Sequence, residues 1–169
     1  MWGDLSAGEH LRLTVDVSAR VAGRSALQQT VADLCSTVEL PRKMLDDMPS
    51  QMRLLDRRRV ELAMAAYNAS TALLIDEIGA GLDIEETRSL YRIVADAVAR
   101  RRVRAAIVVE HKLELLGTFA SEIGLIEAGK ITQRASCSEP ARVAHLFDRM
   151  FDRRRPGVAK PPSQSRTLQ

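Results

Sequence analysis

Apolar positions recur every three or four residues through the first 70 residues, which predicts a series of amphipathic helices. We expect a first helix within residues 5–23 and a second within residues 25–40. Residues 41–55 are irregular and hold two prolines as helix breakers. Residues 56–70 predict a third helix, with Asp56 as its cap. The first part of the chain is therefore predicted to be all-helical.

The first helix has a recognisable start. Ser6 is followed three residues later by Glu9, which is the capping-box pattern. Leu11 and Val15 then begin an apolar stripe, and we expect the helix to end near Gly23. In the second helix the apolar stripe runs through Leu27, Val31, Leu34 and Val38.

The pattern changes after residue 70. Short apolar runs alternate with helical segments, and strands this apolar are typical of a parallel sheet that is covered on both faces. We therefore expect Leu73, Ile75, Ile107 and Val109 to be deeply buried. The predicted elements are strands at 71–76 and 104–110, helices at 84–102 and 112–120, a strand pair at 122–135 around a turn at Ala128 and Gly129, and a helix at 139–151. The fold class is α/β.

Composition and charge narrow the function classes. The 169 residues are the size of one domain, and a net charge of +3 is too mild to indicate a nucleic-acid partner. The arginine runs 57–59 and 100–104 are interpreted as solvated helix surfaces. Cys35 and Cys137 match no metal or redox spacing, so we expect reduced thiols in a cytosolic chain. The basic, proline-rich tail, residues 153–169, is predicted to be disordered.

Acidic residues follow the first predicted strand, in the stretch TALLIDEIGAGLD. Asp76 and Glu77 end this strand, and His111 follows the next one. Ligands bind at the carboxyl ends of strands in an open parallel sheet, so these three residues would share one crevice. One acid would hold a hydrated Mg²⁺, the second would orient or deprotonate an attacking water, and the histidine would sense a phosphate. The alternative is structural: the acids cap the following turn and His111 caps a helix.

These residues, in this order, resemble the ATP-binding subunits of ABC transporters over about residues 4 to 134. The stretch RRRVELAMAAYNASTALLIDEIGAGLD is similar to the region from the signature helix through the Walker B strand to the D-loop. The stretch AAIVVEHKLELLGTFASEIGLIEAGKI is similar to the switch-histidine strand and the closing strand pair. LSAGEHLRL is similar to the start of the helical subdomain.

The resemblance implies a role for each matching residue. Asp76 would be the Walker B aspartate that binds Mg²⁺, and Glu77 would be the catalytic glutamate. Asp83 would be the D-loop aspartate at the bound ATP, and His111 would be the switch histidine. The family hydrolyses ATP in a sandwich dimer and drives a membrane permease. The implied partners are therefore a permease and a second ATP-binding subunit, in a homo- or heterodimer, with no nucleic acid.

The chain departs from the family in its phosphate-binding parts. The stretch 124–131, GLIEAGKI, has the glycine and lysine spacing of a P-loop, but Ile131 stands where a hydroxyl must reach Mg²⁺. We interpret it as a strand pair whose turn carries Gly129. The chain begins where the helical subdomain of the family begins, so the P-loop half would lie upstream.

The signature pentapeptide is also altered. Its register, 52–56, holds Met52, Arg53, Leu54, Leu55 and Asp56 in place of small residues. These side chains would obstruct the approach of a helix N-terminus to the γ-phosphate held by the opposing subunit. Ile78 replaces the common proline after the acidic pair, a substitution that also occurs in polysaccharide-exporting members.

The chain is predicted to contain four parts. They are a helical subdomain (1–56), the Walker B, D-loop and switch-histidine part of an ABC ATPase core with a P-loop-NTPase-like parallel sheet (57–134), a C-terminal helix (135–152) and a disordered tail (153–169).

The predicted function is a partial or degenerate ATP-binding subunit that couples ATP hydrolysis to transmembrane export when a P-loop-bearing half completes it. The isolated chain is predicted to be inactive. It would lie in the cytoplasm at the inner face of the cell membrane. The alternatives are a non-catalytic module that docks a permease or partner ATPase, and a relative of the repair and condensation ATPases.

Overall fold

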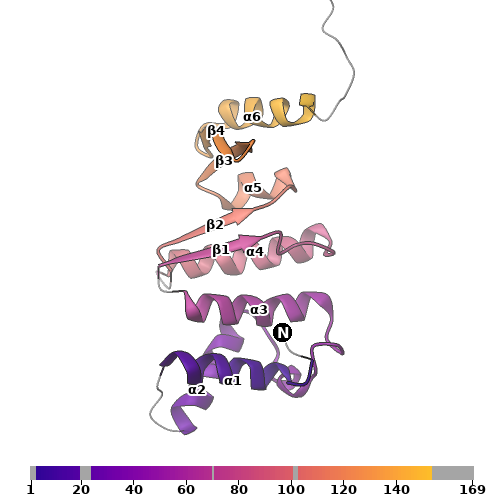
Figure 1. Ribbon diagram of the computed structural model, residues 1–169, viewed down its shortest axis with the longest axis vertical. Helices are drawn as coiled ribbons and strands as arrows, with labels where there is room; N and C mark the ends of the chain where they lie inside the picture. The colour runs from indigo at the N-terminus through magenta and orange to yellow at the C-terminus, as the bar shows by residue number, and fades with distance from the viewer. Residues whose placement is uncertain (1–2, 20–23, 70, 101–102, 154–169) are drawn as a thin grey trace, which may run out of the picture. The chain divides into compact units, whose positions relative to one another are not determined.

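The computed structural model describes residues 3–19, 24–69, 71–100 and 103–153 (Figure 1). The chain divides into two compact units, Met1–His111 and Lys112–Gln169. The described elements of the first unit are α1 (Ala7–Ala19), α2 (Arg24–Thr37), the 3-10 helix η1 (Arg42–Asp46), α3 (Leu54–Asn68), β1 (Ala72–Asp76), α4 (Ile84–Ala99) and β2 (Ala105–Val109).

Helix α1 begins as the sequence predicts. The backbone N–H of Ser6 donates to Oε2 of Glu9 at 2.7 Å, and the N–H of Glu9 donates to Oγ of Ser6 at 3.3 Å. This reciprocal pair confirms the capping box. Leu11 and Val15 are fully buried. The expected end of the helix near Gly23 falls on residues 20–23, outside the described part of the chain.

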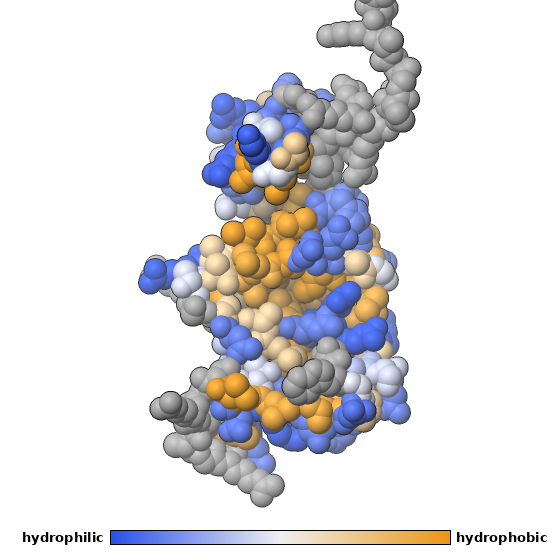
Figure 2. All heavy atoms as spheres, in the orientation of Figure 1, coloured by the Kyte–Doolittle hydropathy of each residue, from blue (hydrophilic) through white to orange (hydrophobic). Residues whose placement is uncertain are grey.

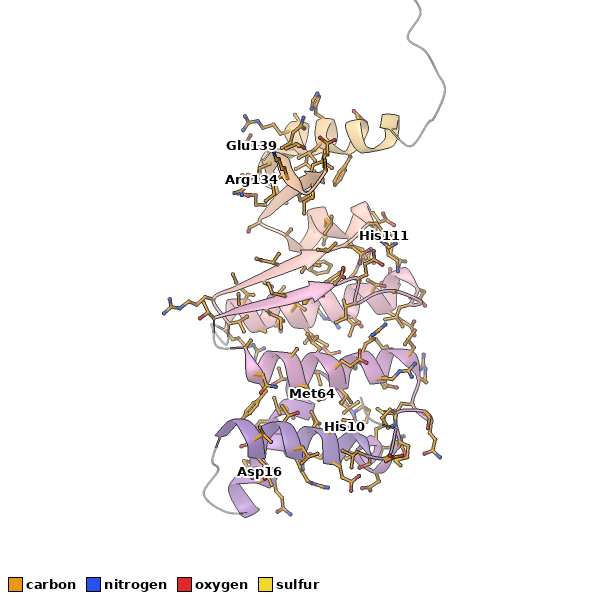
Figure 3. The ribbon with its side chains drawn as sticks, viewed as in Figure 1. His10, Asp16, Met64, His111, Arg134 and Glu139 are labelled. Atoms are coloured by element: carbon orange, nitrogen blue, oxygen red, sulfur yellow. The ribbon has the colours of Figure 1, made fainter. Side chains whose placement is uncertain are left out.

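The helices pack into one core with the strands. The predicted stripe of α2 is buried at Val31, Leu34 and Val38, and α1 packs against α2, α3 and η1. The same apolar cluster continues through Val60 of α3 to Leu73 of β1. Side chains such as Met64, drawn in Figure 3, fill the space between α3 and α1. The helix η1 was not predicted, since residues 41–55 show no helical periodicity.

Helix α3 corrects one sequence prediction. The helix begins at Leu54 and its N-cap residue is Arg53, so Asp56 lies in the first turn and does not cap the helix. Asp56 is instead buried and forms an ion pair with Arg59 at 3.3 Å. A buried carboxylate needs such a partner because the loss of hydration destabilises an unpaired charge.

Strands β1 and β2 are parallel, with Leu74 opposite Ile107 and Asp76 opposite Val109. Side chains alternate between the two faces of such a pair. Leu73 and Ile75 belong to the core, at 3% and 8% exposure.

The opposite face of this pair contradicts the prediction of a sheet covered on both faces. Leu74, Ile107 and Val109 are 73%, 60% and 49% exposed, and Figure 2 shows apolar surface over the strand pair. Burial of Ile107 and Val109 was therefore predicted wrongly. The described helices of this unit pack only on the face of the strand pair that carries Leu73 and Ile75. The alternate residues of each strand therefore point away from this core.

Helix α4 follows the strand β1 after a tight turn. Its N-cap is Asp83, and its inner face buries Leu90, Ile93, Val94 and Ala97. The helix ends at Ala99 and Arg100 is its C-cap residue, while the remainder of the predicted range 84–102 lies outside the described part of the chain.

The second unit contains α5 (Leu113–Phe119), β3 (Glu122–Glu127), β4 (Lys130–Ser136) and α6 (Pro140–Arg153). β3 and β4 form an antiparallel hairpin. Ala128 and Gly129 make its turn with φ angles of 47° and 76°, as predicted. Leu146 of α6 packs on the hairpin beside Leu125 and Ala135. The tail, residues 154–169, lies outside the described part of the chain.

Gly124 pairs with Arg134 inside this hairpin. The P-loop-like spacing of 124–131 is thus carried by two strands and their turn, which agrees with our interpretation of that stretch as a strand pair. No described helix of the chain is long and apolar enough to cross a membrane.

Candidate functional site

The carboxyl ends of β1 and β2 bring the sequence-predicted acids and histidine to one edge. Asp76 is the last residue of β1, and Glu77 follows it. The backbone N–H of Glu77 donates to the carbonyl of Val109, the last residue of β2, at 3.0 Å. Because the two strands are parallel, His111 emerges beside Glu77 at this edge, where Figure 3 labels it.

Glu77 and His111 are in direct contact. Nδ1 of His111 lies 3.2 Å from Oε1 of Glu77, although the two residues are 34 positions apart in sequence. Their side chains are 49% and 53% exposed, so a ligand in solution can reach both. A polar contact between two side chains this exposed adds only about 0–1 kcal/mol to folding stability. The contact therefore contributes little to holding the fold together.

Asp76 is exposed at the same edge. Among the described residues, no group of three or more His, Cys, Asp or Glu side chains is arranged to hold a metal ion. A dedicated protein cage for a metal is thus not formed there. A single exposed carboxylate nevertheless suits Mg²⁺, which keeps several waters and takes one or two carboxylates together with substrate phosphates.

The turn after Glu77 is compact and strained. Glu77 has φ of +45°, a left-handed conformation that is uncommon for residues other than glycine. The N–H of Ala80 donates to the carbonyl of Glu77 at 2.9 Å. A Cβ built on Gly79 would lie 2.3 Å from Cγ2 of Thr87, so only glycine fits beside α4. The turn is therefore held tightly against the start of α4.

Asp83 has a structural role in this turn. Its Oδ1 accepts from the N–H of Glu86 at 2.8 Å, and Oε2 of Glu86 accepts from the N–H of Asp83 at 3.4 Å. The two residues form a capping box at the N-terminus of α4. The ATP-binding role of Asp83 stays a prediction.

The signature register lies close to this turn. Leu54, the first residue of α3, has its Cδ2 3.0 Å from the position of a Cβ on Gly81. Arg53 is 75% exposed and pairs with Glu86 at 3.1 Å. Bulky side chains thus occupy the register 52–56 beside this turn.

Two residues of the site were missed by sequence reasoning. The Glu110 side chain is only 2% exposed, and its Oε2 accepts from the hydroxyl of Tyr91 at 2.5 Å. Its Oε1 accepts from the N–H of His111 at 2.8 Å. Burial, followed by the hydrogen bond and charge of Glu110, raises the pKa of Tyr91. Glu110 was visible only as the last polar residue of an apolar run, and nothing in the sequence pairs it with Tyr91.

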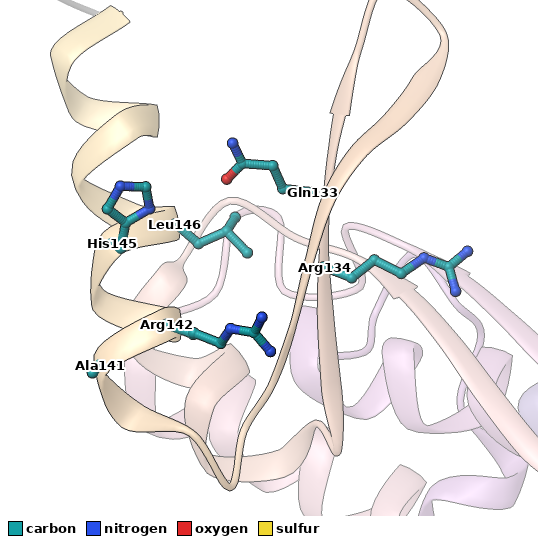
Figure 4. A pocket seen from close by; sticks show the side chains of 6 residues that line it. All are labelled: Gln133, Arg134, Ala141, Arg142, His145 and Leu146. Atoms are coloured by element: carbon teal, nitrogen blue, oxygen red, sulfur yellow. The ribbon is translucent and has the colours of Figure 1, made fainter.

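A surface cavity of about 400 Å³ lies in the second unit between β4 and α6 (Figure 4). Its two arginines already pair with carboxylates: Arg134 with Glu122 at 3.5 Å and Arg142 with Glu139 at 2.9 Å. The cavity is lined by Gln133, Arg134, Ala141, Arg142, His145 and Leu146. His145 has no predicted role, and the exposed surface around this cavity gives no reason to propose one.

No model of a known protein family matches the chain. The methionine import ATP-binding protein MetN of Myxococcus xanthus (strain DK1622) is 28% identical over 143 residues, which are 83% of this chain and 42% of that protein. MetN of Helicobacter hepaticus is 27% identical over 69% of this chain and 32% of its own length. The chain spans less than half the length of these relatives.

Solved structures agree at the level of the fold. A dimeric structure of the ATP-binding cassette MJ0796 in a post-hydrolysis state, bound to ADP and Pi, superposes with a TM-score of 0.70 and 18% identity. A second dimeric structure of MJ0796, a bacterial ABC transporter cassette, gives 0.71 and the same identity. Each match covers 81% of this chain and 59% of the cassette. The chain therefore has the mixed α/β fold of part of an ABC ATPase cassette, and its sequence is similar to ABC ATP-binding subunits.

Proposed function

We propose that the chain is part of an ATP-binding subunit of an ABC transporter and supplies one side of a Mg-ATP site. The observation that carries the proposal is the contact between Glu77 and His111, beside Asp76, at the carboxyl edge of the parallel strand pair. An acid, a second acid and a histidine at one such edge are the groups that phosphoryl transfer needs around Mg²⁺ and an attacking water.

Each residue has a distinct proposed task. Asp76 would bind hydrated Mg²⁺ through its exposed carboxylate. Glu77 would orient the attacking water and accept its proton, and His111 would contact the γ-phosphate. Asp83 would contact the bound ATP from its position as the N-cap residue of α4. When bound, Mg²⁺ supplies charge neutralisation at the phosphates.

The exposed face of the strand pair supports completion by a P-loop-bearing segment. Leu74, Ile107 and Val109 form an apolar patch on a sheet whose fold relatives extend well beyond the part matched here. We propose that the P-loop half packs on this face. Burial of three such side chains would favour the association, since each contributes of the order of 1.5–3 kcal/mol when fully buried. The proposal is the same whether this half is encoded upstream or as a separate chain.

The same reasoning gives the partners. A membrane permease and a second ATP-binding subunit would complete the transporter, and the chain would lie in the cytoplasm at the inner face of the membrane. Ile78 is shared with polysaccharide-exporting members of the resembled family, whereas the similar proteins are named for methionine import. We therefore propose ATP-driven transport and assign neither direction nor substrate.

A second candidate function has one observation in its favour. Arg53 and Leu54 occupy the signature register at the start of α3, and Leu54 lies against the turn that contains Gly81. Such bulk at this position favours a module that docks a permease or partner ATPase without hydrolysing ATP. In that case Asp76, Glu77 and His111 would take no part in ATP hydrolysis.

A reconstitution of the complete ATP site distinguishes the two proposed functions. A P-loop-bearing half of an ABC ATP-binding subunit is supplied in trans or fused ahead of Met1, and ATP hydrolysis is measured with Mg²⁺. The proposal expects turnover above that of the P-loop part alone, and loss of the added turnover with Glu77→Gln but not with the exposed control Glu85→Gln. Association without added turnover, with no effect of Glu77→Gln, would favour the docking module.

A further inference from the structure

Glu110 is a buried acid directly beside the candidate site. It follows β2, and its side chain is 2% exposed. A carboxylate loses hydration when it is buried and stays in the interior only when hydrogen bonds replace that hydration. Both of its oxygens have such partners: the hydroxyl of Tyr91 at 2.5 Å and the N–H of His111 at 2.8 Å.

Tyr91 connects Glu110 to helix α4, which also packs against the turn after Glu77. Tyr91 is 4% exposed and belongs to α4, which packs against β2. Asp83, the N-cap residue of the same helix, follows that turn. A single helix thus anchors both segments that meet at the Glu77–His111 contact.

The orientation of the Glu110 carboxylate shows how it acts on His111. Its Oε1 is 2.8 Å from the main-chain nitrogen of His111 but 3.9 Å from Nδ1 of the ring. The same Nδ1 lies 3.2 Å from Glu77. Glu110 therefore holds the backbone of His111, while Glu77 contacts its ring. Hydrogen bonds to an ionised carboxylate are about twice as strong as neutral ones, which suits this holding function.

We infer that Glu110 is a positioning residue that, with Tyr91, fixes the main chain at His111 so that the imidazole meets Glu77. The inference rests on the proposed function of the Glu77–His111 pair and deepens it. Glu110 is buried away from solvent and acts through His111, so it is not a catalytic residue.

The test uses the full-length chain and NMR spectroscopy, without nucleotide. Two chemical shifts of His111 are measured. The first is that of its backbone amide proton, and the second is that of its imidazole ring, which is compared with and without Glu77→Gln. In the wild-type chain, Glu77→Gln should shift the imidazole signals clearly. In a Glu110→Ala background that shift should fall by at least half, and the His111 amide proton should move upfield because its carboxylate acceptor is lost.

Conservative variants keep the test decisive if Glu110→Ala does not fold. Glu110→Gln retains an acceptor oxygen. It should therefore restore part of the imidazole shift caused by Glu77→Gln, and part of the downfield position of the His111 amide proton. Tyr91→Phe should show a smaller loss in the same direction, and the controls Glu114→Gln and Tyr67→Phe should show none.

An unchanged His111 amide, together with an equal effect of Glu77→Gln in all folded backgrounds, would overturn the positioning role. Because no nucleotide is present, this outcome is independent of the hydrolysis experiment. Failure of reconstitution would count against the proposed function alone.

Discussion

His111 and Glu77 meet across two neighbouring strand ends, with Nδ1 of the histidine 3.2 Å from Oε1 of the glutamate. The contact depends on the backbone on both sides. Glu77 is in a left-handed conformation with φ of +45°, and its N–H is bound to the carbonyl of Val109. Strained backbone that the surrounding structure holds in place is typical of functional sites.

The strain at Glu77 leads to a first prediction. A non-glycine residue at positive φ is destabilising relative to glycine, even after the greater freedom of glycine in the unfolded chain is taken into account. We expect Glu77→Gly to be more stable than Glu77→Ala by about 1 kcal/mol. Both variants lack the carboxylate, so their difference in urea unfolding isolates the backbone. Equal stabilities would show that Glu77 is not left-handed in solution.

A second prediction concerns nucleotide affinity. Phosphate cradling by a glycine-rich loop and its lysine supplies much of the affinity for ATP in P-loop proteins, and the one matching spacing here lies in the β3–β4 hairpin. The isolated chain should therefore bind Mg-ATP with a Kd well above the micromolar range. Isothermal titration calorimetry measures this directly, and a micromolar Kd would contradict it.

Much of the local structure was predictable because it depends on neighbours in sequence. The capping box of Ser6 and Glu9, the buried stripe of α2 and the turn at Gly129 all follow from short-range rules. The meeting of Glu77 and His111 was also predictable, since parallel strands place their carboxyl ends together.

Other features depend on contacts that no local pattern reveals. An apolar strand indicates burial on both faces, but Ile107 is exposed because none of the described residues of its own compact unit buries that face. The pairing of Tyr91 with Glu110 joins residues 19 positions apart through the packing of α4 on β2. Asp56 has the residue type of a cap, yet the helix begins two residues earlier and buries it.

A third prediction tests the turn that positions Glu77. A methyl group at Gly79 would overlap Thr87, with 2.3 Å to Cγ2 and 2.7 Å to Oγ1. Thr87 is fully buried and its hydroxyl donates to the carbonyl of Asp83, so it cannot move away easily. Gly79→Ala should lower the free energy of unfolding by about 1–3 kcal/mol.

Gly117 provides the matched control for that variant. It lies in α5, and a Cβ there would meet no atom within 4 Å. Gly117→Ala should raise stability slightly, by about 0.5–1 kcal/mol, because alanine favours the helix. Combining Gly79→Ala with Thr87→Ala should recover part of the loss. If Gly79→Ala is as harmless as Gly117→Ala in urea unfolding, the turn is looser than described.

A fourth prediction follows from the raised pKa of Tyr91. Burial is the main cause, and the hydrogen bond and charge of Glu110 add to it. The folded chain therefore binds the phenolic proton more tightly than the unfolded chain, whose tyrosine titrates near pH 10. The stabilising effect is constant below about pH 10 and is lost progressively as the pH rises above it, by about 1.4 kcal/mol per pH unit.

Tyr91→Phe isolates this effect because it removes the phenolic proton and keeps the ring. The variant should be less stable than the wild type near pH 8, since Glu110 loses a donor, by about 1–3 kcal/mol. The gap should narrow as the pH rises from 10 to 11, because only the wild type loses stability through Tyr91. Urea unfolding at each pH measures the gap, and Tyr67→Phe, which leaves the Tyr91–Glu110 hydrogen bond in place, should follow the wild type. A gap between Tyr91→Phe and the wild type that is constant with pH would mean that the pKa of Tyr91 is not raised in the folded chain.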